Sequence, residues 1–208
     1  MVTVAYDTRS RLRGVNVLLI NNDLKILDLI ENILQRLGFG NVFVAKDGFE
    51  AIQNLKNNKV DFVTTDWDLR PCSESAEEIP DNAFIVSPWG KFPPVSGVNF
   101  VRCLRHSPKS PNPFVPVIMM TGPTKKNNIM FARDSGVNEV LLKPIEAHDL
   151  CDRIISIIDE PRPFVTCEDF KGPCRRRTAL PLLEGVADRR KLEIKLVEYN
   201  PIKHNVYW

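Results

Sequence analysis

Two patterns of apolar positions alternate along residues 15–160 of the chain. Short runs rich in Val, Ile and Leu predict buried strands at 15–20, 41–45, 60–66, 115–122 and 138–144. Between these runs, apolar residues recur with the spacing that places them on one face of an amphipathic helix. This spacing predicts helices at 24–39, 47–58, 127–136 and 146–160, and a further helix that starts near Ser96. Strands that alternate with helices indicate an α/β domain built from parallel βαβ units.

Residues 72–95 interrupt this alternation. The segment contains four prolines and has no clear period, and it separates the third predicted strand from the helix near Ser96. A loop of this length inside a compact domain is unusual, and it is either functional or disordered. We therefore weigh two interpretations, an ordinary mobile insertion and a lid or docking surface. In the second interpretation the anchors are the apolar residues Phe84, Ile85, Trp89 and Phe92.

The pattern changes again after Pro161. Residues 161–190 are rich in turn-forming residues and Arg, whereas residues 191–199 alternate charged and apolar side chains. The alternation predicts a strand with one apolar face, formed by Leu192, Ile194 and Leu196. Because an exposed apolar strand favours aggregation, we expect this strand to pair with a sheet edge of its own chain or of a second copy.

These boundaries divide the chain into an N-terminal arm (1–13), an α/β body (14–160) and a C-terminal extension (161–208). The formal net charge is −2 over residues 1–160 and +4 over residues 161–208. The basic extension suggests an acidic partner, but the charge is far below that of a typical nucleic-acid-binding protein.

Two classes of protein are excluded by composition. No apolar stretch reaches the roughly 18–20 residues of a membrane span, and the N-terminus has no apolar core of a signal peptide. The five cysteines are an odd number without a Cys-x-x-Cys pair, which is typical of reduced thiols and not of a disulfide framework or a zinc site. We therefore expect a cytoplasmic protein.

Candidate chemistry lies where the predicted strands end. The first strand ends in "INND" (20–23), the third in "VTTDWDLRP" (63–71), the fourth in "MMTG" (119–122) and the fifth in "LLKP" (141–144). In a doubly wound sheet, ligands bind at the carboxyl ends of the strands. An aspartate there can attack a phosphoryl group and hold it as an acyl phosphate. A Lys ammonium and a Thr hydroxyl can then bind the phosphoryl oxygens.

In this order and spacing, the four motifs resemble the receiver domain of bacterial two-component response regulators, over roughly residues 14–160. The resemblance implies a flavodoxin-like, doubly wound, five-stranded parallel sheet of order 2-1-3-4-5 with helices on both faces. It implies that Asp66 is the phosphoacceptor, Thr121 the switch hydroxyl and Lys143 the phosphate-binding cation. It also implies that the backbone carbonyl of Asp68 faces a bound Mg²⁺.

The first motif departs from the family pattern at the metal site. The family usually has two acidic residues at the end of the first strand, and Asn21 and Asn22 stand in their places. Mg²⁺ prefers anionic oxygens, so amide oxygens are poor substitutes. We therefore expect a weak or absent Mg²⁺ site, formed by Asn22, Asp66 and the Asp68 carbonyl, with Asn21 and Asp23 as further candidate ligands.

A second departure concerns the switch. Val140 stands where the family usually has an aromatic residue, so the inward swing of a ring on phosphorylation is not available. Structural interpretations of the same residues stay open. Asn22 or Asp23 is expected to cap the first helix. Asp66 can be a buried carboxylate neutralised by Lys143, and Asp68 can be a solvated turn residue.

The leading hypothesis is a signalling receiver that is not an enzyme. A histidine kinase or phosphotransfer protein would donate a phosphoryl group to Asp66, and a downstream protein partner would bind the changed surface. The extension would serve as an interaction element, including in a homodimer, and 72–95 would lie over or beside Asp66. The second hypothesis is a pseudo-receiver that binds proteins without phosphorylation. The third and weakest is a nucleic-acid adaptor that acts through the basic extension, with steep salt dependence.

Overall fold

A parallel sheet forms the centre of the computed structural model, which describes residues 12–69, 85–87, 90–92, 96–122, 126–167, 170–175, 195–200 and 205–207. Its strands lie in the order β2-β1-β3-β6-β7, and every pairing is parallel. Their bounds are β1 Val17–Ile20, β2 Val42–Ala45, β3 Phe62–Asp66, β6 Val117–Thr121 and β7 Glu139–Leu142. The five predicted strands and their order 2-1-3-4-5 are thereby confirmed.

Four described helices lie between these strands along the chain and a fifth follows β7, and each overlaps its predicted range. Their bounds are α2 Leu24–Leu37, α3 Gly48–Asn57, α4 Gly97–His106, α5 Lys126–Asp134 and α6 Ala147–Asp159. Side-chain caps fix three of the starts, because the oxygens of Asp23, Asp47 and Ser96 accept hydrogen bonds from the first turns of α2, α3 and α4. Helix α2 ends at Gly38, which has a positive φ of 91°.

The helices cover both faces of the sheet and enclose two apolar cores. One core joins α2 and α6 to the sheet through residues such as Ile30, Leu34 and Ile154. The other joins α3 and α4 to the opposite face through residues such as Leu55, Phe100 and Leu104. Strands β1, β3 and β6 are buried along their whole length, as their near-continuous apolar runs require in a parallel sheet.

The 72–95 segment contains regular structure that its sequence pattern did not indicate. Strands β4 (Ile85–Ser87) and β5 (Gly90–Phe92) pair in an antiparallel hairpin, with Ile85 opposite Phe92. The sequence, which has no clear period here, did not predict these two strands. Its remaining residues, including the proposed anchors Phe84 and Trp89, lie outside the described part of the chain.

The extension forms a second sheet of order β11-β10-β8-β9. Its strands are β8 Phe164–Cys167, β9 Phe170–Pro173, β10 Lys195–Asn200 and β11 Asn205–Tyr207. The first two fall in a stretch that the sequence indicated only as turns. The predicted pairing of the last strand occurs within the chain, since β10 is antiparallel to β8.

The predicted apolar face of this strand is wrong in the part that the structure describes. Leu196 is 57% exposed, whereas the neighbouring Val197 is 1% exposed. The register explains the reversal, because Val197 lies opposite Phe164, which packs with Phe114 in a small buried cluster. Leu192 and Ile194 lie outside the described residues. A shift of one residue in a strand exchanges its two faces.

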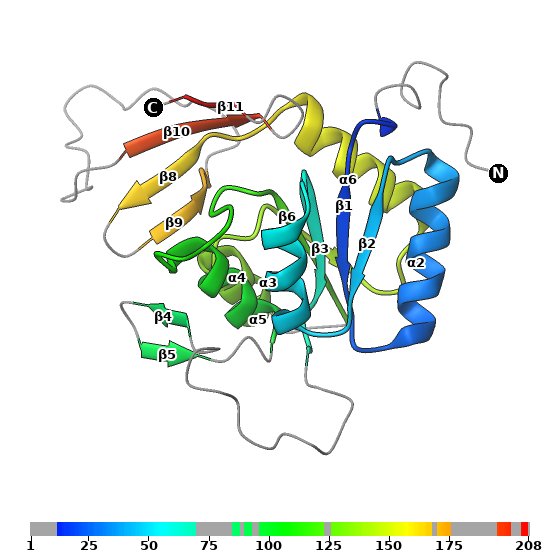
Figure 1. Ribbon diagram of the computed structural model, residues 1–208, viewed down its shortest axis with the longest axis horizontal. Helices are drawn as coiled ribbons and strands as arrows, with labels where there is room; N and C mark the ends of the chain where they lie inside the picture. The colour runs from blue at the N-terminus through cyan, green and yellow to red at the C-terminus, as the bar shows by residue number, and fades with distance from the viewer. Residues whose placement is uncertain are drawn as a thin grey trace.

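Figure 1 shows the two ends of the central sheet. At the end where the strands finish, the carboxyl edge, lie the starts of the helices and the β4–β5 hairpin. At the opposite end, the amino edge, lies the extension sheet. No described helix has the length and apolar character needed to cross a bilayer. The described cysteines (Cys103, Cys151, Cys167 and Cys174) are free thiols.

Candidate functional site

The predicted phosphoacceptor and cation meet at the carboxyl edge. Asp66 is the last residue of β3, and Lys143 follows β7. The Lys143 ammonium donates to Asp66 Oδ2 over 2.8 Å, and the two side chains are 28% and 12% exposed. The other carboxylate oxygen, Oδ1, accepts the backbone N–H of Trp67 over 2.8 Å. The geometry therefore fixes Asp66 as a nearly buried carboxylate with a partner on each oxygen.

Thr121 lies between these two residues in the sheet. It is the last residue of β6, the strand that separates β3 from β7, and its side chain is buried. Its carbonyl accepts the backbone N–H of Lys143 over 2.7 Å. The three residues that the motifs singled out are thus brought together on adjacent strand ends, as the leading hypothesis requires.

Asn21 follows β1 and is completely buried. Its Oδ1 accepts the backbone N–H of Asp23 over 2.9 Å, while its Nδ2 is buried without a hydrogen-bond partner. Asn22 beside it is partly exposed. Asp23 is exposed, and its Oδ1 caps α2 by accepting the N–H groups of Lys25 and Ile26. The expectation that Asn22 or Asp23 caps the first helix is confirmed for Asp23.

Asp68 and Gly97 join the two ends of the 70–95 segment next to Asp66. Asp68 forms an isolated antiparallel bridge with Ser96, and the Gly97 N–H donates to the Trp67 carbonyl over 2.8 Å. A Cβ at Gly97 would lie 2.0 Å from the Asp66 carbonyl oxygen, so the start of α4 can approach this closely only with glycine. Sequence reasoning missed Gly97, because only the fold brings it to Asp66. Asp68 is partly buried and bridged, not a fully solvated turn residue.

The donor set at this edge fits Mg²⁺ poorly. Both Asp66 oxygens already accept hydrogen bonds, and Asp23 Oδ1 is used by the helix cap. Asn21 Oδ1 is engaged by Asp23 N–H, so the atom of Asn21 that lacks a partner is a donor. Mg²⁺ needs oxygen ligands and sheds its water reluctantly. Val140, at the place of the usual aromatic residue, is partly buried against the core beneath α4.

A second polar cluster, which sequence reasoning missed, lies at the amino edge. Arg105 of α4 is completely buried. Its guanidinium donates to the carbonyls of Pro113, Val115 and Gly136 over 2.8 to 3.1 Å, and to Asn138 Oδ1 over 3.4 Å. It also lies 5.0 Å above the centre of the Phe164 ring of β8. One sequence signal could have identified Arg105 as buried. Its helical spacing from Val98 and Val101 places all three residues on one face of α4.

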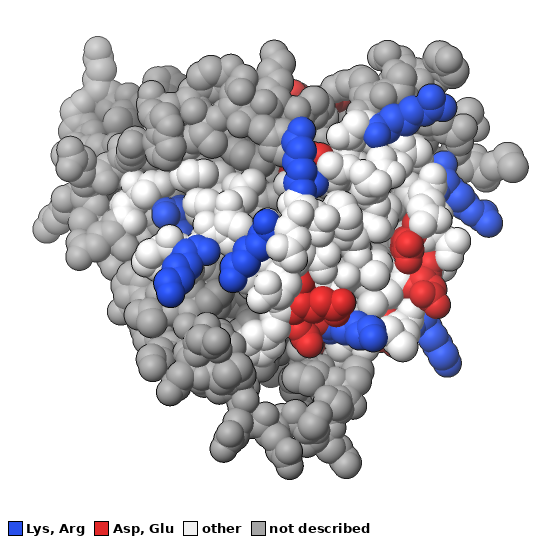
Figure 2. All heavy atoms as spheres, in the orientation of Figure 1, with Lys and Arg blue, Asp and Glu red and all other residues white. Residues whose placement is uncertain are grey.

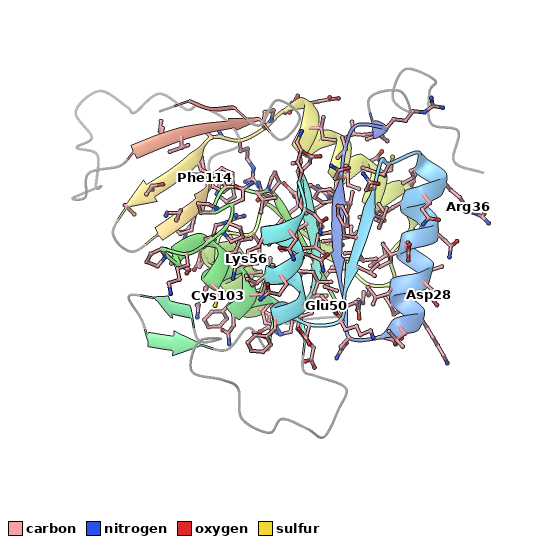
Figure 3. All side chains as sticks on the ribbon, viewed as in Figure 1. Asp28, Arg36, Glu50, Lys56, Cys103 and Phe114 are labelled. Atoms are coloured by element: carbon pink, nitrogen blue, oxygen red, sulfur yellow. The ribbon has the colours of Figure 1, made fainter. Side chains whose placement is uncertain are left out.

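Arg162 extends this cluster into the connection between α6 and β8. Its guanidinium donates to the carbonyls of Cys174 and Asn138 and lies 3.3 Å from Glu139 Oε1. Arg153 of α6 approaches the other oxygen of Glu139 at 3.6 Å. A cavity of about 310 Å³ opens beside Arg162, between the start of β7, the end of α6 and Phe164. In Figure 3, Phe114 lies next to β8, and Glu50 lies toward the opposite edge.

Chemotaxis proteins are among the proteins of known name that this chain resembles in sequence. The chain is 25% identical over 147 residues to chemotaxis protein CheY-3 of Vibrio cholerae, covering 71% of this chain and 94% of the relative. It is 26% identical over 145 residues to chemotaxis protein CheY of Pseudomonas aeruginosa, covering 70% and 97%. No model of a known protein family matches the chain.

Solved structures share the fold. Vibrio cholerae CheY4 superposes with a TM-score of 0.52 at 21% identity, covering 69% of this chain and 98% of that protein. A CheY-like response regulator receiver domain from Methanospirillum hungatei gives 0.51 at 21% identity, covering 70% and 94%. The receiver domain of a Pseudomonas aeruginosa sensor histidine kinase, solved with a coordinated magnesium ion, gives 0.50 at 21%, covering 69% and 95%.

Proposed function

Because the chain carries a CheY-like receiver domain, we propose that it receives signals by accepting a phosphoryl group on Asp66. The observation that carries the proposal is the 2.8 Å contact between Lys143 Nζ and Asp66 Oδ2, at the end of a sheet where Thr121 also ends a strand. A carboxylate so placed is a nucleophile beside a cation that can receive the oxygens of the incoming group.

The transfer balances without any further reactant. A carboxylate oxygen of Asp66 attacks the phosphorus of a phosphohistidine or a small acyl phosphate. The bond from phosphorus to the donor nitrogen or oxygen breaks, and the leaving group keeps the electron pair. Lys143 keeps its proton and moves its hydrogen bond from the carboxylate to a phosphoryl oxygen. In the proposal, the Thr121 hydroxyl donates to another phosphoryl oxygen.

The partners follow from this chemistry. A histidine kinase or a phosphotransfer protein in the cytoplasm supplies the phosphoryl group. A downstream protein binds the surface that changes, and a homodimer through the extension is part of the same proposal. Nucleic acid is a weaker candidate, because the formal net charge of the chain is only +2. In Figure 2 the described acidic side chains lie mainly below the centre and on the right of the face, and basic side chains also lie on its left.

Intact-protein mass spectrometry tests the phosphoacceptor. The full chain is incubated with acetyl phosphate, and a mass gain of one phosphoryl group is expected. Asp66→Asn should abolish the gain while the protein stays folded, since the amide retains the shape of the side chain. A gain that persists in Asp66→Asn would place the phosphoryl group elsewhere and refute the assignment.

A pseudo-receiver is the alternative, and one observation favours it. Each Asp66 oxygen already has a partner, so the ion pair with Lys143 can stabilise the edge without phosphorylation. In that case the chain binds its partner protein with the surface that it already presents. The two functions are distinguished by the same experiment, because a pseudo-receiver gains no phosphoryl mass from either acetyl phosphate or a phosphorylated phosphotransfer protein.

A further inference from the structure

The orientation of the Asn21 amide is fixed by a neighbour that can only donate. The backbone N–H of Asp23 lies 2.9 Å from the Asn21 side chain, so the atom that faces it must be the oxygen. The amide nitrogen and its two hydrogens therefore point away from Asp23. This nitrogen is buried and has no hydrogen-bond partner. A buried donor without a partner is costly, which indicates that an acceptor is missing.

The register of the sheet places Asn21 beside Asp66. Ile20 of β1 pairs with Thr65 of β3, so the next residues along the two strands, Asn21 and Asp66, are neighbours. Side chains alternate between the faces of a sheet, and Leu19 and Phe62 belong to the core under α2 and α6. Asn21 and Asp66 therefore occupy positions on that same face.

The Asp66–Lys143 pair in this pocket has no net formal charge, so it offers a metal ion no excess of negative charge. Lys143 contributes an ammonium, and Asn21 contributes the positive end of its amide dipole. Asp66 is the carboxylate that the ammonium neutralises. A divalent cation would meet an amide donor and an ammonium where it needs anionic oxygens. A phosphoryl group, with its negative charge and three acceptor oxygens, would meet two donors.

We propose that this pocket binds a phosphoryl-type oxyanion without a divalent cation, with Asn21 Nδ2 and Lys143 Nζ as donors to its oxygens. The proposal rests on the receiver function proposed above and deepens it, because it concerns the same pocket. The amides of the first motif are then not a damaged metal site. A metal ion would compensate the negative charge of the oxyanion. In this proposal a hydrogen bond from Asn21 takes over that role.

The first experiment compares phosphorylation with and without metal. The full chain is incubated with acetyl phosphate in excess EDTA or in Mg²⁺, and the rate of phosphoryl mass gain is measured. We expect the two rates to agree within about twofold. A rate that rises tenfold or more with Mg²⁺ overturns the proposal. No gain in either solution, and none from a phosphorylated phosphotransfer protein, refutes the phosphoacceptor function instead, and the binding experiment below then decides this proposal.

Asn21→Asp provides the matched variant for this comparison. The new carboxylate keeps an oxygen to accept the Asp23 N–H but replaces the donor with a negative charge. We expect the metal-free rate to fall at least tenfold, because hydrogen bonds to charged groups contribute that much or more. The rate should recover in Mg²⁺. Asn32→Asp makes the same chemical change on the exposed face of α2 and should leave both rates unchanged.

The second experiment does not depend on phosphoryl transfer. Asp66→Ala removes the carboxylate and leaves Lys143 and Asn21 with room for an anion. We expect inorganic phosphate in EDTA to raise the melting temperature of this variant. Adding Asn21→Asp should weaken phosphate binding at least tenfold, and adding Asn32→Asp should not change it. Phosphate that binds Asp66→Ala only with Mg²⁺, or equally well in the Asn21→Asp double variant, overturns the proposal.

Discussion

One buried side chain at each end of the central sheet, Arg105 and Asn21, shows a contrast in hydrogen bonding. At the amino edge, the buried Arg105 guanidinium donates to three carbonyls and to Asn138 Oδ1. At the carboxyl edge, the buried Asn21 amide has a donor without a partner, and the Asp66–Lys143 pair is partly exposed. Polar groups with complete sets of partners hold elements together, whereas incomplete sets are typical of sites that await a ligand. We therefore assign structure to the first edge and chemistry to the second.

The largest expected effect on stability comes from removing a cation, and its size should differ between Arg105 and Lys143. Arg105→Met leaves several buried carbonyls without donors, and we expect it to lower the free energy of unfolding by about 3–5 kcal/mol. Lys143→Met leaves Asp66 with the Trp67 N–H and partial exposure, so we expect a loss of about 1–2 kcal/mol. Urea denaturation measures both.

The exposed Arg133, paired with Asp134, is the control for loss of a cation in this comparison. Arg133→Met should cost less than about 0.5 kcal/mol. A larger loss for Lys143→Met than for Arg105→Met would reverse our assignment of the two edges.

Substitution of one glycine at each edge, Gly97 and Gly136, should have an intermediate effect on stability and extends the comparison of the two edges. A Cβ at Gly97 would meet the Asp66 carbonyl, and one at Gly136, which has a φ of +95°, would lie 2.6 Å from the Lys171 carbonyl. We expect Ala at either position to cost about 1–3 kcal/mol in urea denaturation. Only Gly97→Ala should also slow phosphorylation of Asp66. Gly14→Ala, with nothing near its Cβ, should change neither quantity.

The last effect is a pH dependence that belongs to the amino edge. Burial, and then the charges of Lys171, Arg105 and Arg102, lower the pKa of His106 from 6.5 to about 4. Between these values the unfolded chain binds a proton that the folded chain does not. This contribution to stability is therefore complete above pH 6.5 and is lost as the pH falls toward 4. His106→Gln should flatten that part of a stability–pH profile, and an unchanged slope would contradict the assigned cause.

Sequence patterns predicted the structure correctly where a residue type in a given pattern occurs in only one kind of structural environment. The five strands follow from periodicity, and the convergence of Asp66, Thr121 and Lys143 follows from the positions of the motifs at strand ends, whereas the strand order was implied by the resemblance to receiver domains. Arg105 was missed because the same side chain serves on solvated helix faces and in cores, and only tertiary packing decides. Val197 was missed because the apolar alternation of its strand does not specify which neighbour it pairs with. The unpartnered nitrogen of Asn21 depends on a hydrogen bond across two residues, which composition does not encode.

The bridge between Asp68 and Ser96 has a consequence for how the chain tolerates changes in length. It brings the ends of the 70–95 segment together beside Asp66, and the Gly97 N–H bond to Trp67 secures them. The entropy of closing such a loop grows only by about 0.6 kcal/mol for each doubling of its length. The sheet is therefore nearly indifferent to how many residues lie between these ends. A change of length between these ends should therefore leave the Asp68–Ser96 bridge and the start of α4 in place beside Asp66.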